Sequence, residues 1–158
     1  MADLIKNTLT IAMDRGLKIA TAESCTGGLI AAALTEMSGS SAVFERGFVT
    51  YSNEAKVEML GIMPSTLDDF GAVSEQIAIE MASGALIRSD ADFAVSVTGI
   101  AGPGGSEHKP EGRVCFGLAQ SNAETLSQTI EFGAIGRGQV RAKTVEHALT
   151  MLITAMLK

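Results

Sequence analysis

The sequence predicts an α/β domain, a three-layer α/β/α sandwich in which helices cover both faces of a mixed, mostly parallel sheet. Helical and strand-like patterns alternate over the first two-thirds of the chain, and two consecutive strand-like segments follow before a long closing helix. The chain has 158 residues, of which 46% are hydrophobic and 19% charged. By size scaling, such a chain buries about two-thirds of its unfolded surface. Residues 1–158 are therefore expected to form a single domain with a substantial core.

The first helix is expected over residues 3–15, where apolar side chains recur on one helical face and Gly16 supplies the stop. Residues 17–22 then alternate like a strand. A polar turn at 23–28 leads into a helix-forming segment at 29–37. This part of the chain therefore reads as strand, polar turn and helix.

A second strand is expected over residues 43–51, which are rich in Val, Phe, Thr and Tyr. Ser52 or Asn53 can then cap a short helix over 54–60, which Gly61 closes.

Residues 64–71 are expected to be a connector, followed by a helix that Ser74 caps and that runs through residue 88. The strand with the most buried character follows at 93–98. A glycine-rich loop continues from it to residue 112, and a loop of this length in a small domain usually has a function.

The last third of the chain predicts a hairpin, 113–120 with 126–132, and a closing helix over 138–157. No internal repeat or linker interrupts the pattern.

Charge and composition exclude several classes of function. Acidic residues outnumber basic ones by 18 to 12, for a formal net charge of −6, and the basic residues do not cluster, so nucleic-acid binding is not expected. No apolar run reaches membrane-spanning length, and the N-terminus does not read as a secretory signal. Cys25 and Cys115 lie far apart without metal-type spacing, which fits a reducing cytoplasm and predicts no metal site.

The first candidate site is the turn after the first strand. Ser24 lies where a strand meets a helix, and Gly27 and Gly28 would let a ligand approach exposed N–H groups that can hold an anion or a developing oxyanion. The alternative is that Ser24 or Thr26 only caps the helix while the glycines shape the turn.

The second candidate pair is Tyr51, the only tyrosine of the chain, and Lys56, about one turn into the next helix. A lysine can act as a general base toward a serine only if its pKa falls well below the value of about 10.4 for an unperturbed lysine. The alternative is a solvated lysine and a tyrosine at the sheet edge.

The third candidate is the loop that begins at Thr98 and Gly99 and continues through Gly102 and Gly104. Its backbone N–H groups could cradle a phosphate or a ribose, although it lacks both the dinucleotide-binding glycine pattern and the Walker lysine. The alternative is a flexible connector.

Arg137 and Arg141 stand four residues apart at the start of the last helix, where they could clamp a phosphate or simply be solvated. His108 and His147 have no partners at nucleophile or metal spacing, so a mechanism that uses Cys25 and a histidine is the weaker option.

Several long blocks of the sequence resemble one known family. They are TAESCTGG at 21–28, VTYSNEAKVEMLGI at 49–62, GAVSEQIAIEMA at 71–82, VSVTGIAGPGG at 95–105 with KPEGRV at 109–114, and RGQVRAKTVEHAL at 137–149. Together they resemble the C-terminal domain family of the competence/damage-inducible protein CinA, whose stand-alone members are nicotinamide-nucleotide amidohydrolases.

The resemblance implies hydrolysis of the carboxamide of nicotinamide mononucleotide to nicotinate mononucleotide and ammonia, without a metal or other cofactor. It implies that Ser24 is the nucleophile and that Tyr51 and Lys56 activate it. It places substrate binding on residues near the nucleophile, on the glycine-rich loop and on the arginines of the last helix: Thr26, Gly27, Gly28, Thr98, Gly99, Gly102, Gly104, Arg137 and Arg141. A homodimer or larger assembly in the cytoplasm is expected.

The chain departs from the family pattern at one point, because Ile135, Gly136 and Arg137 stand where relatives commonly have Gly-Asp-Arg. Two other functions stay open at this stage: a catalytically silent nucleotide-binding or regulatory module, and an amidase that acts on another small amide.

Overall fold

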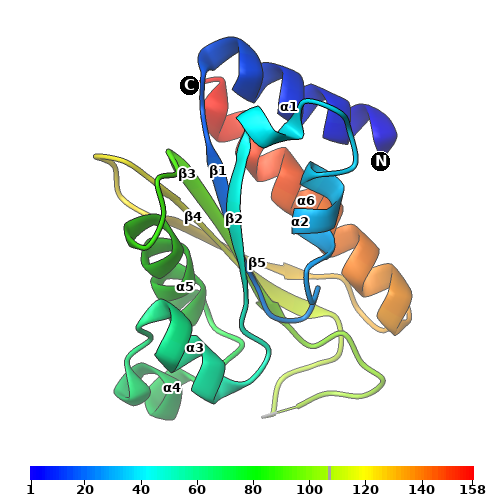
Figure 1. Ribbon diagram of the computed structural model, residues 1–158. Coiled ribbons are helices and arrows are strands. Elements are labelled where there is room, and N and C mark those ends of the chain that lie inside the picture. Colours follow the sequence, from blue (N-terminus) through cyan, green and yellow to red (C-terminus); the bar gives the residue numbers. More distant parts are fainter. Residues whose placement is uncertain (107) are drawn as a thin grey trace.

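The computed structural model describes residues 1–106 and 108–158 and has a five-stranded sheet between two groups of helices (Figure 1). The strands are β1 Ile19–Glu23, β2 Phe44–Val49, β3 Phe93–Gly99, β4 Arg113–Gln120 and β5 Leu126–Glu131. Their order in the sheet is β2-β1-β3-β4-β5. β1 pairs in parallel with β2 and β3, whereas β3–β4 and β4–β5 are antiparallel. The sheet is thus mixed, as predicted, with two pairings of each kind.

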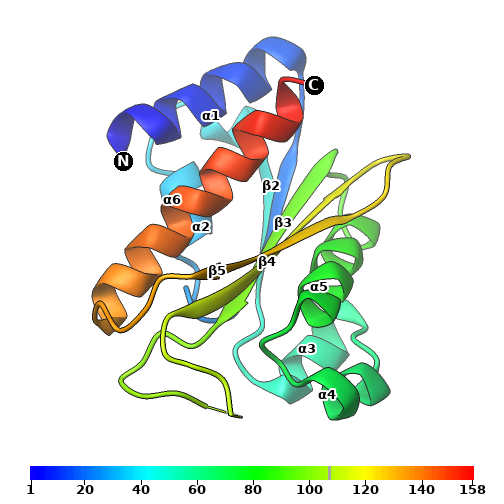
Figure 2. The same ribbon diagram turned by 180° about the vertical axis from the view of Figure 1, so that it is seen from behind.

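Helices cover both faces of this sheet, which confirms the predicted sandwich (Figures 1 and 2). The layer that contains the first and last helices consists of α1 Ala2–Arg15, α2 Leu29–Leu34 and α6 Arg137–Met156. The opposite layer consists of α3 Asn53–Leu60, α4 Pro64–Phe70 and α5 Glu75–Ile87. A short 3-10 helix, η1 Ser40–Ala42, precedes β2.

The two faces of the sheet are packed differently. Large side chains such as Val95, Val97 and Phe116 fill the layer beneath α6. On the α5 side the strands carry small residues, and a Cβ atom at Gly117 would lie only 2.3 Å from the Ala78 carbonyl oxygen of α5. Small residues on the strands therefore let α5 lie close against the sheet.

The periodic elements were predicted well, and the exceptions have local causes. The connector expected at 64–71 is wrong, because α4 forms there with Pro64 at its first position and Gly71 at its end. The helix expected at 29–37 ends at Leu34, and the Thr35 hydroxyl donates to the Ala31 carbonyl oxygen in its last turn.

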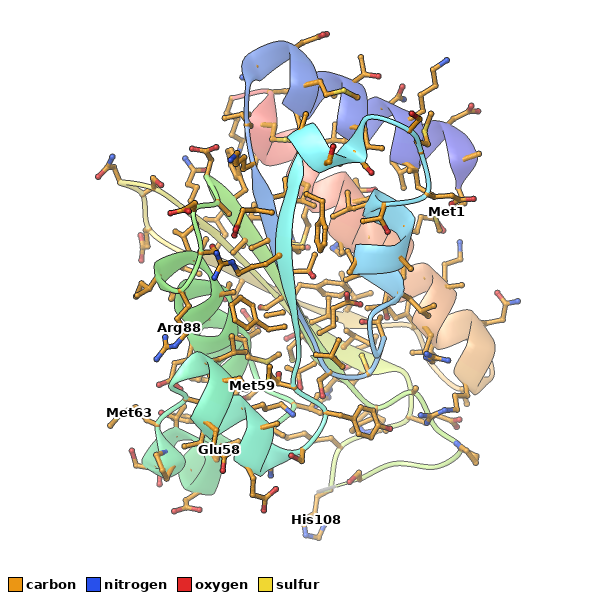
Figure 3. All side chains as sticks on the ribbon, in the orientation of Figure 1. Met1, Glu58, Met59, Met63, Arg88 and His108 are labelled. Atoms are coloured by element: carbon orange, nitrogen blue, oxygen red, sulfur yellow. The ribbon has the colours of Figure 1, made fainter. Side chains whose placement is uncertain are left out.

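Side chains occupy the space on both faces of the sheet, while Met59 and Met63 lie on the outside of the α3–α4 layer (Figure 3). The chain exposes 7326 Å² of surface, close to the roughly 7,500 Å² that size scaling gives for its mass. Among the described residues, no helix is both long and apolar enough to cross a membrane.

Candidate active site

The candidate site lies where the three parallel strands end. Ser24 follows β1, Tyr51 follows β2 by two residues, and Gly99 is the last residue of β3. In the strand order β2-β1-β3, the chain passes from β1 to β2 on one side of β1 and later to β3 on the other side of β1. The chain thus changes direction across the sheet at the end of β1. Ligands of open α/β sheets bind at such switch points, beyond the carboxyl ends of the strands.

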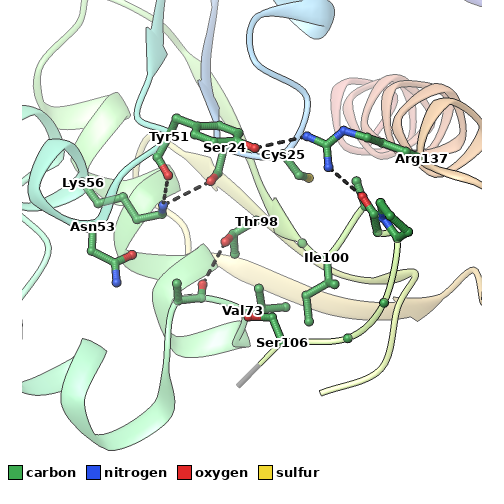
Figure 4. A pocket seen from close by; sticks show the side chains of 17 residues that line it. Ser24, Cys25, Tyr51, Asn53, Lys56, Val73, Thr98, Ile100, Ser106 and Arg137 are labelled. Atoms are coloured by element: carbon green, nitrogen blue, oxygen red, sulfur yellow. Dashed lines mark hydrogen bonds between the residues drawn. The ribbon is translucent and has the colours of Figure 1, made fainter. Parts of the chain in front are cut away.

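A buried serine–lysine pair forms the centre of the site (Figure 4). Lys56 Nζ donates to Ser24 Oγ at 3.1 Å, and the two residues are only 1% and 8% exposed. Ser52 caps α3 by accepting a hydrogen bond from the Ala55 amide, which begins the helix whose first turn carries Lys56. Lys56 Nζ also donates to the Tyr51 carbonyl oxygen at 3.2 Å. The amine is therefore held between the Ser24 hydroxyl and the Tyr51 carbonyl oxygen.

These residues line a pocket of about 310 Å³, which lies within the usual size range of small-ligand sites. Its wall consists of the ends of β1 and β3, the start of α3, the 100–106 loop and Arg137 (Figure 4). Among the described lining residues none is acidic, whereas Lys56 and Arg137 are basic. The pocket therefore favours an anionic ligand even though the whole chain is acidic.

Arg137 joins two parts of the pocket rim. Its guanidinium donates to the Gly102 carbonyl oxygen at 2.8 Å and to the Tyr51 hydroxyl at 3.1 Å. The phenol of Tyr51 thus faces Arg137, and it is the backbone carbonyl of Tyr51 that contacts Lys56. Tyr51 is 62% exposed, as expected for a residue at the mouth of the pocket.

The glycine-rich loop is held by side chains from both of its ends. The Thr98 hydroxyl donates to the Ala72 carbonyl oxygen at 2.8 Å, and Lys109 Nζ donates to the carbonyl oxygens of Phe70 and Val73. The loop and the segment between α4 and α5 therefore form one continuous wall.

The structure brings most of the predicted site residues together. Those that line the pocket are Ser24, Tyr51, Lys56, Thr98, Gly99, Gly102, Gly104 and Arg137. Thr26, Gly27, Gly28 and Arg141 are not among the lining residues.

The four predicted residues outside the wall have local contacts of their own. The Thr26 hydroxyl donates to Glu23, and the Gly27 amide donates to the Ser24 carbonyl oxygen at 3.1 Å. Arg141 donates to the carbonyl oxygens of Cys25 and Thr26. The turn after Ser24 is thus held in place by side chains from β1 and α6.

Sequence reasoning missed the role of Glu23. Its fully buried carboxylate accepts hydrogen bonds from the Thr26 hydroxyl at 2.5 Å and from the amides of Ile30 and Ala31 at 2.8 and 2.9 Å. It caps the start of α2 from outside the helix, where Gly28 offers no side chain to do so. No local pattern predicts a cap that lies six residues before the first residue of its helix.

Asn53, Val73 and Ser106 also line the pocket and were not predicted. Asn53 stands three residues before Lys56 on α3, so helical spacing could have placed it on the same face. Val73 and Ser106 have no local signal in the sequence.

Cys25 lines the pocket but does not have the character of a nucleophile. It is 5% exposed, and burial raises the pKa of its thiol to about 12. Burial likewise raises the pKa of the Cys115 thiol. Both thiols are therefore protonated at neutral pH. A cysteine acts as a nucleophile only as the thiolate, so neither thiol meets this requirement.

We expect neither cysteine to react with a disulfide reagent such as dithionitrobenzoate in the native protein at pH 7.5, because the thiolate is the reacting form. Both should react after unfolding in guanidinium chloride. Rapid labelling of Cys25 in the folded protein, with loss of activity, would instead identify it as the nucleophile. The absorbance of the released thiolate measures both reactions.

His147 lies away from the site, with its ring against Phe116 and a hydrogen bond between its Nε2 and Gln128 Oε1. Burial lowers its pKa. In the described part of the chain, no three or more His, Cys, Asp or Glu side chains are grouped as metal ligands.

A serine within hydrogen-bond reach of a lysine, at the ends of parallel strands in an α/β domain, is the arrangement found in enzymes that activate a serine. The chain belongs to the CinA C-terminal domain family, whose model matches residues 1–156.

Relatives with established names support this membership. The chain is 52% identical over 139 residues to nicotinamide-nucleotide amidohydrolase PncC of Escherichia coli (strain K12), covering 87% of this chain and 84% of the relative. It is 52% identical over 143 residues to the PncC protein of Enterobacter agglomerans, covering 90% and 85%. The crystal structure of competence/damage inducible protein CihA from Agrobacterium tumefaciens matches with a TM-score of 0.95 at 54% identity, covering 99% of this chain and 95% of that one.

Proposed function

We propose that this protein is an amidohydrolase that converts nicotinamide mononucleotide to nicotinate mononucleotide and ammonia. The observation that carries the proposal is the 3.1 Å contact between Lys56 Nζ and Ser24 Oγ inside a pocket with a basic rim. The names of the PncC relatives supply the substrate, since each is called a nicotinamide-nucleotide amidohydrolase.

In the proposed reaction Ser24 is the nucleophile and Lys56 the general base. The neutral Lys56 amine takes the proton of Ser24 while Ser24 Oγ attacks the carboxamide carbon. Lys56 then gives a proton to the departing nitrogen, which leaves as ammonia, and an ester to Ser24 remains. Water attacks this ester, Ser24 regains its proton and nicotinate mononucleotide is released.

The environment of Lys56 suits this role. Burial disfavours the charged form of an amine, and Lys56 is 1% exposed. The Tyr51 carbonyl oxygen, 3.2 Å from Lys56 Nζ, orients the amine toward Ser24. We therefore assign Tyr51 an orienting role through its backbone, with its phenol directed to the rim.

The phosphate of the substrate is assigned to the rim. Arg137 offers a guanidinium there, and the Gly104 backbone can approach an anion without side-chain obstruction. With the phosphate bound at the rim, the carboxamide is positioned at Ser24, so binding energy from the phosphate contributes to turnover.

Comparison of nicotinamide mononucleotide with nicotinamide riboside and free nicotinamide tests the assignment. Removing the phosphate is expected to lower kcat/KM by about 10²-fold, because one or two charge-assisted hydrogen bonds are lost. Part of this loss should appear in kcat. Ammonia release measures all three rates. Equal kcat/KM for the mononucleotide and the riboside would show that the pocket does not use the phosphate, and would favour an amidase for another small amide.

A further inference from the structure

Arg141 braces the turn that follows the nucleophile. Its Nε donates to the Cys25 carbonyl oxygen at 3.2 Å and its Nη2 to the Thr26 carbonyl oxygen at 3.1 Å. These are the first two carbonyl groups after Ser24. The guanidinium comes from α6, which is remote in sequence from the turn.

Holding the two carbonyl groups also fixes the amides of the same peptide units. In a trans peptide the C=O and N–H bonds point in opposite directions. The Cys25 carbonyl, held by Arg141, therefore directs the Thr26 N–H away from α6. The Thr26 carbonyl does the same for the Gly27 N–H, which donates to the Ser24 carbonyl oxygen at 3.1 Å.

This bonding pattern selects which amides remain available. In the described part of the chain, the amides of Cys25, Thr26 and Gly28 donate to no protein atom, unlike that of Gly27. Of these three residues, Cys25 is the one that lines the pocket. Amides directly after a nucleophilic serine are the usual donors to a developing oxyanion.

We propose that Arg141 is a positioning residue that holds the turn after Ser24 so that the Cys25 amide can act as an oxyanion donor. Arg141 holds the Thr26 carbonyl, the Gly27 amide of the same peptide unit donates to the Ser24 carbonyl, and this bond orients the amide of Cys25, which lines the pocket. Arg141 does not bind the phosphate of the substrate. The proposal rests on the proposed function in that Ser24 is the nucleophile.

The division between the two arginines follows from their contacts. Arg137 lines the pocket, whereas Arg141 does not. To reach a phosphate, the Arg141 guanidinium would have to give up two carbonyl groups that no other side chain is seen to hold. A planar guanidinium suits two neighbouring acceptors better than the single ammonium of lysine does.

On the opposite side of the same turn, the Glu23 carboxylate accepts from the Thr26 hydroxyl and from the start of α2. A buried anion and a guanidinium therefore hold the turn from two sides. Removing Arg141 releases the Cys25 carbonyl and leaves the Thr26 carbonyl with the Leu29 amide, at 3.2 Å, as its remaining donor. The contacts of Glu23 with α2 stay in place.

The test compares Arg141→Met with Arg137→Met on nicotinamide mononucleotide and nicotinamide riboside. For Arg141→Met we expect kcat to fall about 10²-fold for both substrates, the effect of losing an oxyanion donor. KM and the preference for the phosphorylated substrate should stay within about threefold of wild type. For Arg137→Met the preference itself should fall. A tenfold or greater loss of preference in Arg141→Met would overturn the proposal and make Arg141 a phosphate ligand.

A second test measures the reactivity of Ser24 with a reagent that contains neither the phosphate nor the carboxamide of the substrate. Phenylmethylsulfonyl fluoride reacts when Ser24 Oγ displaces fluoride from sulfur and the Ser24 proton passes to Lys56. We expect its rate constant with Arg141→Met to fall at least tenfold, and that with Lys143→Met, a substitution on the exposed surface of α6, to stay at the wild-type value. An unchanged rate with Arg141→Met would overturn the proposal.

The two readouts separate failure of the substrate assignment from failure of this inference. If the wild type does not hydrolyse the mononucleotide but is sulfonylated at Ser24, the substrate is wrong while the reagent still tests Arg141. Thermal unfolding checks that each variant is folded. Arg141→Lys, which keeps the charge but not the two-pronged donor, provides a second variant and should remain impaired at least tenfold.

Discussion

Ser24→Ala is expected to lower kcat for ammonia release from nicotinamide mononucleotide by about 10³-fold or more, because it removes the hydroxyl that Lys56 contacts and that we assign as the nucleophile. Ser24 Oγ is the atom that Lys56 Nζ contacts at 3.1 Å, and the neighbouring Cys25 carries a thiol whose pKa burial raises to about 12. The alanine variant should therefore have no substitute nucleophile.

Binding should survive this change. The rim that we assign to the phosphate, Arg137 and the 100–106 loop, is untouched by the substitution. Titration calorimetry with Ser24→Ala should give a dissociation constant for the mononucleotide. We expect it to lie within about threefold of the constant that single-turnover kinetics give for the wild-type protein. Ser121→Ala, in the exposed turn between β4 and β5, is the matched control and should keep full activity. Turnover by Ser24→Ala above one-tenth of the wild-type rate would contradict the assignment of the nucleophile.

Lys56→Met should have an effect of similar size. Methionine keeps most of the length and apolar stem of lysine but cannot accept a proton, so kcat should fall about 10³-fold or more. Because Lys56 is 1% exposed, replacing its amine by an apolar group should not lower the thermal unfolding midpoint.

The pH profile makes this prediction specific. Since only the neutral amine can take the proton of Ser24, wild-type kcat/KM should rise with pH, and the residual activity of Lys56→Met should lack this rise. Lys143→Met on α6 is the matched control, as Lys143 pairs with Glu146 on the exposed surface. A Lys56→Met variant that retains the wild-type rise would show that another group is the base.

Periodicity and turn chemistry were sufficient for the elements that bury a regular apolar face. The long helix α6 was predicted from residues such as Val145, Leu149 and Leu152, and the β4–β5 hairpin from its length, its composition and the polar turn that joins its strands. α4 was missed because it buries none of its residues, so no apolar stripe marks it. Its start at Pro64 was the only signal.

The site could be predicted only as separate candidates. Ser24 and Lys56 are 32 residues apart, and their contact depends on β1 lying between β2 and β3, a strand order that no local pattern determines. From the sequence, the resemblance to the CinA family was the argument that assigned these separate candidates to one site. The direction of the Tyr51 phenol, the buried Glu23 cap and the contacts of Arg141 with backbone carbonyls all depend on tertiary packing.

The measurement that tests the central claim most directly is ammonia release from nicotinamide mononucleotide by the wild-type protein, before and after modification of Ser24 by phenylmethylsulfonyl fluoride. We expect ammonia and nicotinate mononucleotide in equal amounts, at a rate that a chelator does not change and that falls in proportion to the fraction of Ser24 modified. Folded protein that binds the mononucleotide saturably but releases no ammonia would contradict the account and indicate a nucleotide-binding module.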